Sequence, residues 1–211
     1  MIVIIDYNMG NVASVKNMIK KIGYEAIVSN DISIIKKATK LILPGVGSFD
    51  HGVKSLKELK LFDVIKEKIL LESTPILGIC LGMQLLTKGS EEGELGGLGL
   101  IDGFTKRFSK QILEKNLKIP HMGWNFIKSE NETLLLSDME LNSRFYFVHS
   151  YHVVCENPMN STAITHYGYD FTCMIEKENV YGVQFHPEKS HKFGMKIIKN
   201  FLELVKCTEV E

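Results

Sequence analysis

The sequence lacks several features that mark special classes of protein. None of its cysteines forms a Cys-x-x-Cys pair, and the four lie far apart as Cys80, Cys155, Cys173 and Cys207. This spacing argues against a disulfide scaffold or a zinc site and fits a reducing cytoplasm. Lys plus Arg and Asp plus Glu each number 25, so no excess charge favours nucleic acid or an anionic membrane as a partner. The apolar run at residues 1–5 has no basic flank and is too short for a signal peptide or a membrane span.

The length and composition are those of an ordinary globular protein. Hydrophobic residues make up 45% of the chain and charged residues 24%. A chain of 211 residues can bury a full α/β core but is short for two such domains. We therefore expect residues 1–211 to form a single cytoplasmic domain, with about the last five residues frayed.

The first half of the chain alternates between two hydrophobic patterns. Short apolar runs predict strands at residues 2–6, 26–28, 40–44 and 74–79, and helical spacing predicts helices at residues 12–22, 31–38 and 61–71. This alternation predicts right-handed crossovers and a parallel sheet. A ligand would then bind beyond the carboxyl ends of the strands.

The second half of the chain has short aromatic or alternating segments instead. They predict antiparallel strands at the sheet edge, or in a second small sheet, at residues 104–108, 125–128, 144–148, 151–155, 163–166, 172–176 and 180–185. An amphipathic helix is expected at residues 192–206.

Cys80 stands at the most informative point of the chain. The strand at residues 74–79 runs directly into a helical segment at residues 81–86, and the joint reads Gly-Ile-Cys-Leu-Gly. Small residues two before and two after a nucleophile permit a sharp strand-to-helix turn that exposes its side chain above the sheet. A buried structural cysteine flanked by packing glycines is the alternative interpretation of the motif alone.

A cysteine nucleophile needs a base, and the base needs an orienting group. His186 ends a predicted strand and is followed by Pro187 and Glu188. If that strand runs parallel to the others, His186 lies at the same edge of the sheet as Cys80. The Glu188 carboxylate can then hold one ring nitrogen and leave the other for the thiol. We expect no fixed acid partner for the remaining histidines, which are His51, His121, His149, His152, His166 and His191.

An acyl-transfer site also needs donors for the oxyanion of its tetrahedral intermediate. The backbone amide of Leu81, directly after the cysteine, can supply one donor. The segment Gly-Val-Gly at residues 45–47 follows the third strand, and its amides at Val46 and Gly47 can supply a second.

These motifs together resemble the class I (triad-type) glutamine amidotransferases. The resemblance is carried by Pro-Gly-Val-Gly-Ser-Phe at residues 44–49, Gly-Ile-Cys-Leu-Gly-Met-Gln at 78–84, Ser-Glu-Glu-Gly at 90–93, Pro-His-Met-Gly-Trp-Asn at 120–125, Tyr-Phe-Val-His-Ser-Tyr at 146–151 and Gly-Val-Gln-Phe-His-Pro-Glu-Lys-Ser at 182–190. Within that family the chain is most similar to the glutaminase subunits of imidazole glycerol phosphate synthase, over residues 2–204. The resemblance implies a flavodoxin-like, mostly parallel sheet with helices on both faces and antiparallel edge strands.

The resemblance also implies roles for individual residues. Cys80 would attack the glutamine carboxamide, with His186 as base and acid and Glu188 as its orienting group. Residues expected to bind glutamine are Gln84, Glu92, His149, Ser150 and Tyr151, and Val46, Gly47 and Leu81 would form the oxyanion hole. Asn11, Trp124 and Asn125, in loops, would face a partner, the (β/α)8 cyclase subunit that receives the ammonia. The resemblance implies no cofactor and no metal.

Two other interpretations stay open from the sequence. The same glutaminase chemistry could supply ammonia to a synthetase that aminates sugars for surface glycans, to which the segments at residues 144–149 and 190–195 point. A cysteine hydrolase or chaperone with the same elbow is a more remote alternative.

Overall fold

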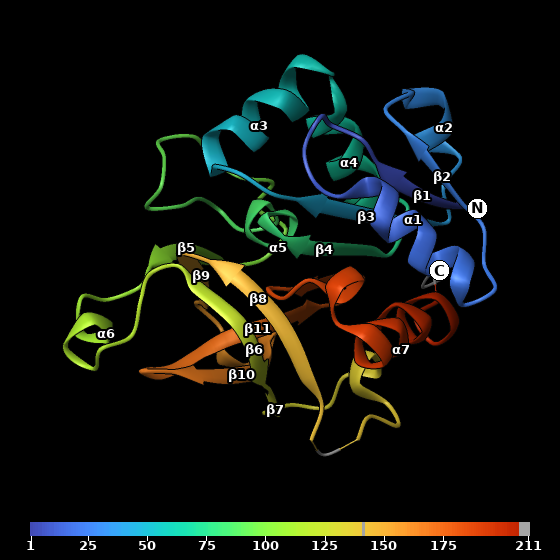
Figure 1. Cartoon of the computed structure of the whole chain (residues 1–211). Coiled ribbons are helices and arrows are strands. Elements are labelled where there is room, and N and C mark those ends of the chain that lie inside the picture. The colour runs from blue at the N-terminus through green and yellow to red at the C-terminus, as the bar shows by residue number, and fades with distance from the viewer. Residues whose placement is uncertain (141, 207–211) are drawn as a thin grey trace.

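The structure, a computed structural model, describes residues 1–140 and 142–206 (Figure 1). Its central strands are all parallel and follow the order β2 (Ala26–Ser29), β1 (Ile2–Ile5), β3 (Lys40–Gly45), β4 (Ile76–Cys80) and β12 (Val180–Val183). This is the flavodoxin-like strand order, with the late strand β12 in the fifth place. The predicted parallel sheet is therefore confirmed. The expected fraying of residues 207–211 lies outside the described residues.

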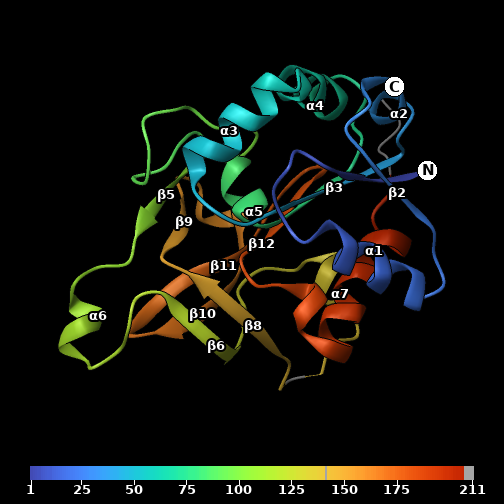
Figure 2. The same ribbon diagram turned by 45° about the horizontal axis from the view of Figure 1, so that its top comes forward.

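The sheet continues beyond β12 as antiparallel strands. They are β11 (Tyr169–Lys177), β10 (Ser161–Tyr167) and β7 (Lys128–Ser129), with β9 (Tyr151–Cys155) and β5 (Gly103–Arg107) branching from β11. A separate two-stranded sheet pairs β6 (His121–Phe126) with β8 (Arg144–His149), and Figure 2 shows these two strands side by side. The expected antiparallel strands and second small sheet are confirmed, except that the segment expected at residues 180–185 forms β12, which pairs antiparallel with β11 but parallel with β4.

The prediction for β6 was wrong in its position. A strand was expected at residues 125–128, and Trp124 and Asn125 were expected in a loop. Both residues lie inside β6, which begins at His121 and pairs with β8 along its whole length. The bounds of β6 are set by its pairing with the distant strand β8, so the local spacing of hydrophobic residues did not reveal where β6 begins.

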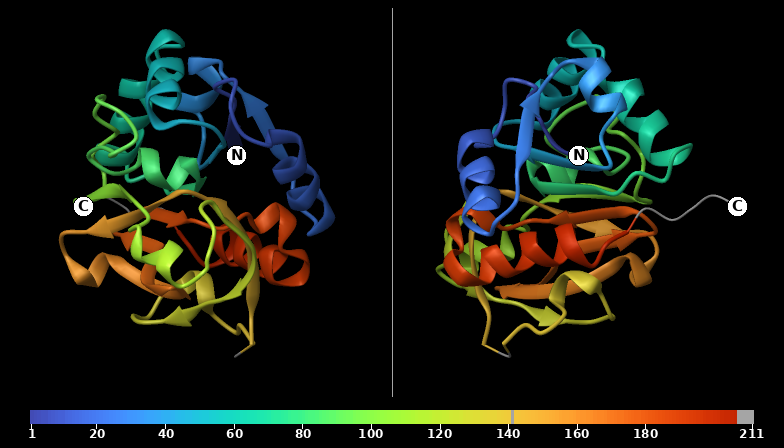
Figure 3. Two further views of the ribbon diagram at one scale, coloured as in Figure 1. Left: turned by 60° about the vertical axis from the view of Figure 1, so that its left-hand side comes forward. Right: turned by 90° about the vertical axis from the view of Figure 1, so that its right-hand side faces the viewer.

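The two faces of the parallel sheet are covered by different helices. In β1, Val3 and Ile5 pack in one cluster with buried residues of α2 (Ile32–Lys36), α3 (Phe49–Glu58) and α4 (Leu61–Leu70). Ile4 points the other way, into a cluster with α1 (Val12–Lys21) and α7 (His191–Glu203). Figures 1 and 3 show α3 and α4 on one side of the strands and α7 on the other. This alternation within one strand is the signature of a sheet buried on both faces.

Several helix boundaries differ from the expectation. The Asp31 side chain caps α2 by accepting from the Ser33 amide at 2.7 Å, but α2 ends at Lys36 instead of residue 38. Helix α7 ends at Glu203 instead of residue 206. Helix α3 was not predicted, because Gly52 interrupts its apolar spacing; there the missing side chain lets Leu85 approach.

The remaining elements are short. They are the helices α5 (Leu81–Leu85) and α6 (Gln111–Glu114) and the 3₁₀ turns η1 (Leu134–Leu136), η2 (Pro158–Asn160) and η3 (Pro187–Lys189). Among the helices of the described ranges, none has the length and apolar character to cross a membrane.

The turn from β4 into α5 depends on its glycines. A Cβ at Gly82 would lie 1.7 Å from the Leu43 carbonyl oxygen, and a Cβ at Gly78 would lie 2.7 Å from the Gly82 carbonyl oxygen. Both obstacles are backbone atoms and cannot rotate away. The glycines around Cys80 are therefore what lets α5 lie directly against β3 and β4.

We expect Gly82→Ala to lower the free energy of unfolding by roughly 3 kcal/mol, or to prevent folding, because overpacking here meets backbone atoms. Gly96→Ala is the matched control, since the nearest atom to a Cβ there is the Lys88 carbonyl oxygen at 3.6 Å, an ordinary contact. The control should stay within about 0.5 kcal/mol of the parent chain. Urea denaturation measures both, and equal midpoints for the two variants would contradict the role of Gly82.

Candidate active site

Cys80 occupies a strained backbone corner between β4 and α5. Its φ of 55° and ψ of −111° lie outside the regions that residues with a Cβ normally adopt. Its sulfur lies 3.9 Å from the Val148 carbonyl oxygen and 3.8 Å from Nε2 of Gln184. The expected sharp strand-to-helix turn is present, and it holds the thiol at the carboxyl end of the sheet.

The parallel pairing of β12 with β4 brings His186 to the same edge. Gly182 lies opposite Gly78 and Val183 opposite Ile79, so the chain beyond β12 passes beside Cys80. His186 is fixed there by its backbone amide, which donates to the Tyr146 carbonyl at 2.9 Å.

His186 forms a buried pair with Glu188. Its Nδ1 lies 2.9 Å from Oε1 of Glu188, and the two side chains are only 2% and 3% exposed. A carboxylate accepts, so Nδ1 carries the donated hydrogen. Among the described residues, Nε2 has no hydrogen-bond partner. This nitrogen is therefore the one available to a thiol or a substrate.

Burial lowers the pKa of His186, but the neighbouring Cys80 and Glu188 outweigh burial and raise it to about 10. The imidazole ring is then charged at neutral pH and can deliver a proton to a leaving group. Burial raises the pKa of the half-buried Cys155 to about 11 and that of the buried Cys173 well above its usual value, so both of these residues favour the neutral thiol.

A cavity of about 320 Å³ opens over Cys80 and His186. Its wall is formed by Val46, Gly47, Cys80, Leu81, Gln84, Glu92, Pro120, Val148, His149, Ser150, Tyr151 and His186. The structure thus brings together every residue expected in the oxyanion hole and the glutamine pocket, with Glu188 behind the histidine. A larger hollow of about 980 Å³ lies apart from it, between η1 and β11, and contains no cysteine or histidine.

The segment expected to supply an oxyanion donor lies next to the nucleophile. Gly45 pairs directly with Cys80 across β3 and β4. Two residues on, Gly47 has a φ of 110°, which favours glycine. A Cβ at Gly45 would lie 2.4 Å from the Tyr7 hydroxyl oxygen, so the strand end is tightly packed from behind.

Two polar side chains of the wall are held by the protein itself. The Gln84 amide Nε2 donates to the Tyr151 carbonyl and to Oε1 of Gln184, both at 3.1 Å. Oε2 of Glu92 accepts from the Phe49 amide at 2.8 Å, at the N-terminus of α3, where a negative charge is favoured. The acidic loop that carries Glu92 is therefore an ordered part of the cavity.

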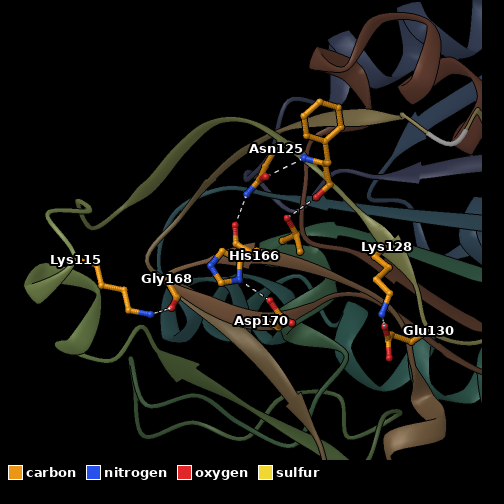
Figure 4. Close-up of polar contacts among 9 residues, drawn as sticks. Lys115, Asn125, Lys128, Glu130, His166, Gly168 and Asp170 are labelled. Atoms are coloured by element: carbon orange, nitrogen blue, oxygen red, sulfur yellow. Dashed lines mark hydrogen bonds and ion pairs between the residues drawn. The ribbon is translucent and has the colours of Figure 1, made fainter.

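The residues expected at a partner interface lie away from the cavity. Asn11 precedes α1, and Trp124 is 41% exposed and stacks on His191 with ring centroids 5.5 Å apart. Nδ2 of Asn125 donates to the His166 carbonyl of β10 at 2.8 Å (Figure 4).

One expectation about the histidines was wrong. His166 also has an acid partner, since its Nδ1 lies 2.6 Å from Oδ1 of Asp170 (Figure 4). The antiparallel register of β10 and β11 places these two residues opposite each other, which sequence distance alone did not show. Both side chains are more than half exposed and do not line the cavity, so this pair does not compete with His186.

Gln184 was missed as a site residue. Its side chain is fully buried next to Cys80, and its Nε2 donates to the Cys80 sulfur at 3.8 Å. The available signal was a single amide side chain within the otherwise apolar run at residues 180–185. Pro120 and Val148 line the cavity as well and were not assigned a role.

We expect the His186 ring to titrate near pH 10 in the parent chain and at a clearly lower pH in Glu188→Gln. In this variant the carboxylate that raises the pKa of the ring is gone, while burial still lowers that pKa. Because the folded pKa is raised, the charged ring stabilises the fold fully below its ordinary pKa of about 6.5, and this stabilisation is lost as the pH rises through about 10. Histidine NMR titration measures the shift. His121, whose pKa burial lowers to about 4, is the internal control; an unmoved His186 would contradict the pairing.

Comparisons with known proteins identify the family of the chain. Residues 3–205 match the family model of the class-I glutamine amidotransferases. Imidazole glycerol phosphate synthase subunit HisH 2 of Methanococcus maripaludis is 58% identical over 203 residues, which cover 96% of this chain and 99% of that protein. A protein of the same name from Pseudomonas aeruginosa is 48% identical, covering 97% and 100%. Among solved structures, PurLQS from Thermotoga maritima has a TM-score of 0.72 at 20% identity, covering 97% of this chain and 98% of that one. The chain belongs to the class-I glutamine amidotransferase family.

Proposed function

We propose that this chain is the glutaminase subunit of an imidazole glycerol phosphate synthase and works with a Cys-His-Glu triad. The observation that carries the proposal is the strained corner at Cys80 beside the free Nε2 of His186, in a cavity of amino-acid size. The family membership and the relatives named as such subunits support it.

The reaction follows from the positions of the side chains. The Cys80 thiolate attacks the carboxamide carbon of glutamine, and the tetrahedral oxyanion accepts hydrogen bonds from the Leu81 amide and from an amide of Val46 or Gly47. The charged His186 ring gives its proton to the nitrogen as the C–N bond breaks, which releases ammonia and leaves a thioester. Neutral His186 then takes a proton from a water molecule that attacks the thioester, glutamate leaves, and the Cys80 thiolate and the charged His186 ring are restored. Glu188 holds the ring throughout.

The rest of the cavity suits the amino-acid end of glutamine. The substrate carries an α-ammonium group, and Glu92 is the acidic side chain of the cavity wall. Residues 149–151 form part of the cavity wall, and Gln84 supports this part by donating to the Tyr151 carbonyl. No cofactor or metal takes part in these steps.

The ammonia acceptor is a second subunit. In the proposed complex a (β/α)8 cyclase uses the ammonia to convert PRFAR into imidazole glycerol phosphate and AICAR, for histidine synthesis in the cytoplasm. Asn11, Trp124 and Asn125 are the residues proposed to face it. The single-domain chain would form a heterodimer with this cyclase.

Cys80→Ala should abolish glutamine hydrolysis while the fold is kept, because no other group in the cavity can form the thioester. Cys155→Ser is the control and should keep full turnover, since this thiol lies outside the cavity. Glutamate release measures turnover, and circular dichroism verifies the fold. Persistent hydrolysis of glutamine by Cys80→Ala would overturn the proposal, because Cys80 could then not be the nucleophile.

The pathway is tested separately. The chain should co-purify with a histidine-pathway cyclase, and PRFAR should raise glutaminase turnover of the complex. A chain that hydrolyses glutamine, fails to bind the cyclase and instead transfers ammonia through a sugar-aminating synthetase would contradict the histidine pathway and leave the glutaminase chemistry intact.

A further inference from the structure

A run of buried and partly buried hydrogen bonds connects strand β6 with the Cys80 sulfur. It begins at Asn125, whose Nδ2 lies 3.4 Å from Nε2 of His121, and Nδ1 of His121 lies 3.2 Å from Nε2 of His149. Nδ1 of His149 lies 2.8 Å from the Tyr151 carbonyl oxygen. That carbonyl also accepts from Gln84, Gln84 donates to Gln184, and Gln184 donates to the sulfur. We call this run the β6–Cys80 network.

The direction of every bond in the network can be derived. The Tyr151 carbonyl can only accept, so the hydrogen of His149 is on Nδ1 and its Nε2 accepts. His121 must then donate through Nδ1 and accept at Nε2, where the Asn125 amide donates. Burial lowers the pKa of His121 to about 4 and that of His149 well below its usual value, so both rings are neutral, as this pattern requires.

Every donor hydrogen in the network has its own bond, and the one shared acceptor, the Tyr151 carbonyl oxygen, has two lone pairs for its two donors, His149 and Gln84. Nδ2 of Asn125 has two hydrogens, one for His121 and one for the His166 carbonyl shown in Figure 4. Oδ1 of Asn125 accepts from the Phe126 amide at 2.9 Å. The two hydrogens of Gln84 Nε2 likewise have separate acceptors. A network in which these bonds have a single consistent direction has one arrangement and resists small displacements.

The backbone supplies a second connection between the same two places. Met122 pairs with Val148 across β6 and β8, and the Val148 carbonyl is the one that contacts the Cys80 sulfur. The side chains on the outer face of β6, those of Met122, Trp124 and Phe126, are exposed. A displacement of the outer face of β6 therefore needs to pass through only one neighbouring strand, β8, to reach the Cys80 sulfur.

We propose that His121, His149 and Gln184 are positioning residues, through which the β6–Cys80 network couples the outer face of β6 to the placement of the nucleophile. The inference rests on the proposed glutaminase function with a partner subunit. A partner docked on β6 shifts Asn125 and His121, and the directional hydrogen bonds carry the shift through the Tyr151 carbonyl and Gln84 to the thiol.

His121→Phe tests the coupling with little change in packing. The His121 ring stacks on Phe147 and Tyr167, with centroids 5.0 Å and 4.1 Å apart, so a phenyl ring keeps the stacking and removes both nitrogens. His152→Phe is the matched control. His152 is a buried histidine of the same aromatic cluster, bound to the Tyr169 hydroxyl and outside the network.

In the complex with the partner, at saturating partner and cyclase ligand, His121→Phe should reduce the ratio of stimulated to basal turnover by about fivefold or more, with KM for glutamine unchanged. Asn125→Ala combined with His121→Phe should reduce it no further than the worse single variant. His152→Phe should keep the parent ratio. Equal ratios for His121→Phe and His152→Phe would overturn the coupling.

The wild-type chain gives a test that needs no substitution. Nitrogen-15 NMR at pH 7 should show both His121 and His149 as neutral rings protonated on Nδ1. A charged His149, or one protonated on Nε2, would refute the network directly. This result is independent of turnover, so it stands apart from the Cys80→Ala experiment that tests the proposed function itself.

Discussion

The candidate site depends on the parallel pairing of β12 with β4. β4 ends at Cys80, and the chain beyond β12 carries His186 and Glu188, so their common register sets the distance between nucleophile and base. β12 achieves this orientation because the antiparallel strand β11 precedes it and returns the chain. The antiparallel half of the molecule therefore serves two purposes. It reverses the chain direction before β12, and its strand β8 supplies Val148 and His149 to the cavity wall near the thiol.

The environment gives chemically identical rings opposite behaviour within one small region. His186 and His149 both line the cavity and both are buried. His186 has a carboxylate and a thiol as neighbours, which raise its pKa, whereas burial lowers that of His149, which bonds to a carbonyl. The His186 ring can carry a proton at neutral pH, whereas the neutral His149 ring connects His121 to the Tyr151 carbonyl by hydrogen bonds. This division fits a site with a single proton carrier.

Sequence patterns predicted the parts of the molecule that local chemistry decides. The parallel strands, the cap at Asp31 and the corner at Cys80 follow from short-range spacing, and the structure has all three. Contacts between distant segments decided the rest. The start of β6, the pairing of His166 with Asp170 and the contact of Gln184 with the thiol all arise across strands. No periodicity within one segment encodes such contacts.

The late position of β12 has a consequence for the newly made chain. During synthesis Cys80 leaves the ribosome long before His186, and until β12 is added β4 is the edge strand of the sheet, paired with β3 on one side and open on the other. The nascent thiol therefore lacks its base and the part of the cavity wall that residues 120 and 148–151 supply. A glutaminase assembled in this order would release no free ammonia before nearly the whole chain has been translated and folded.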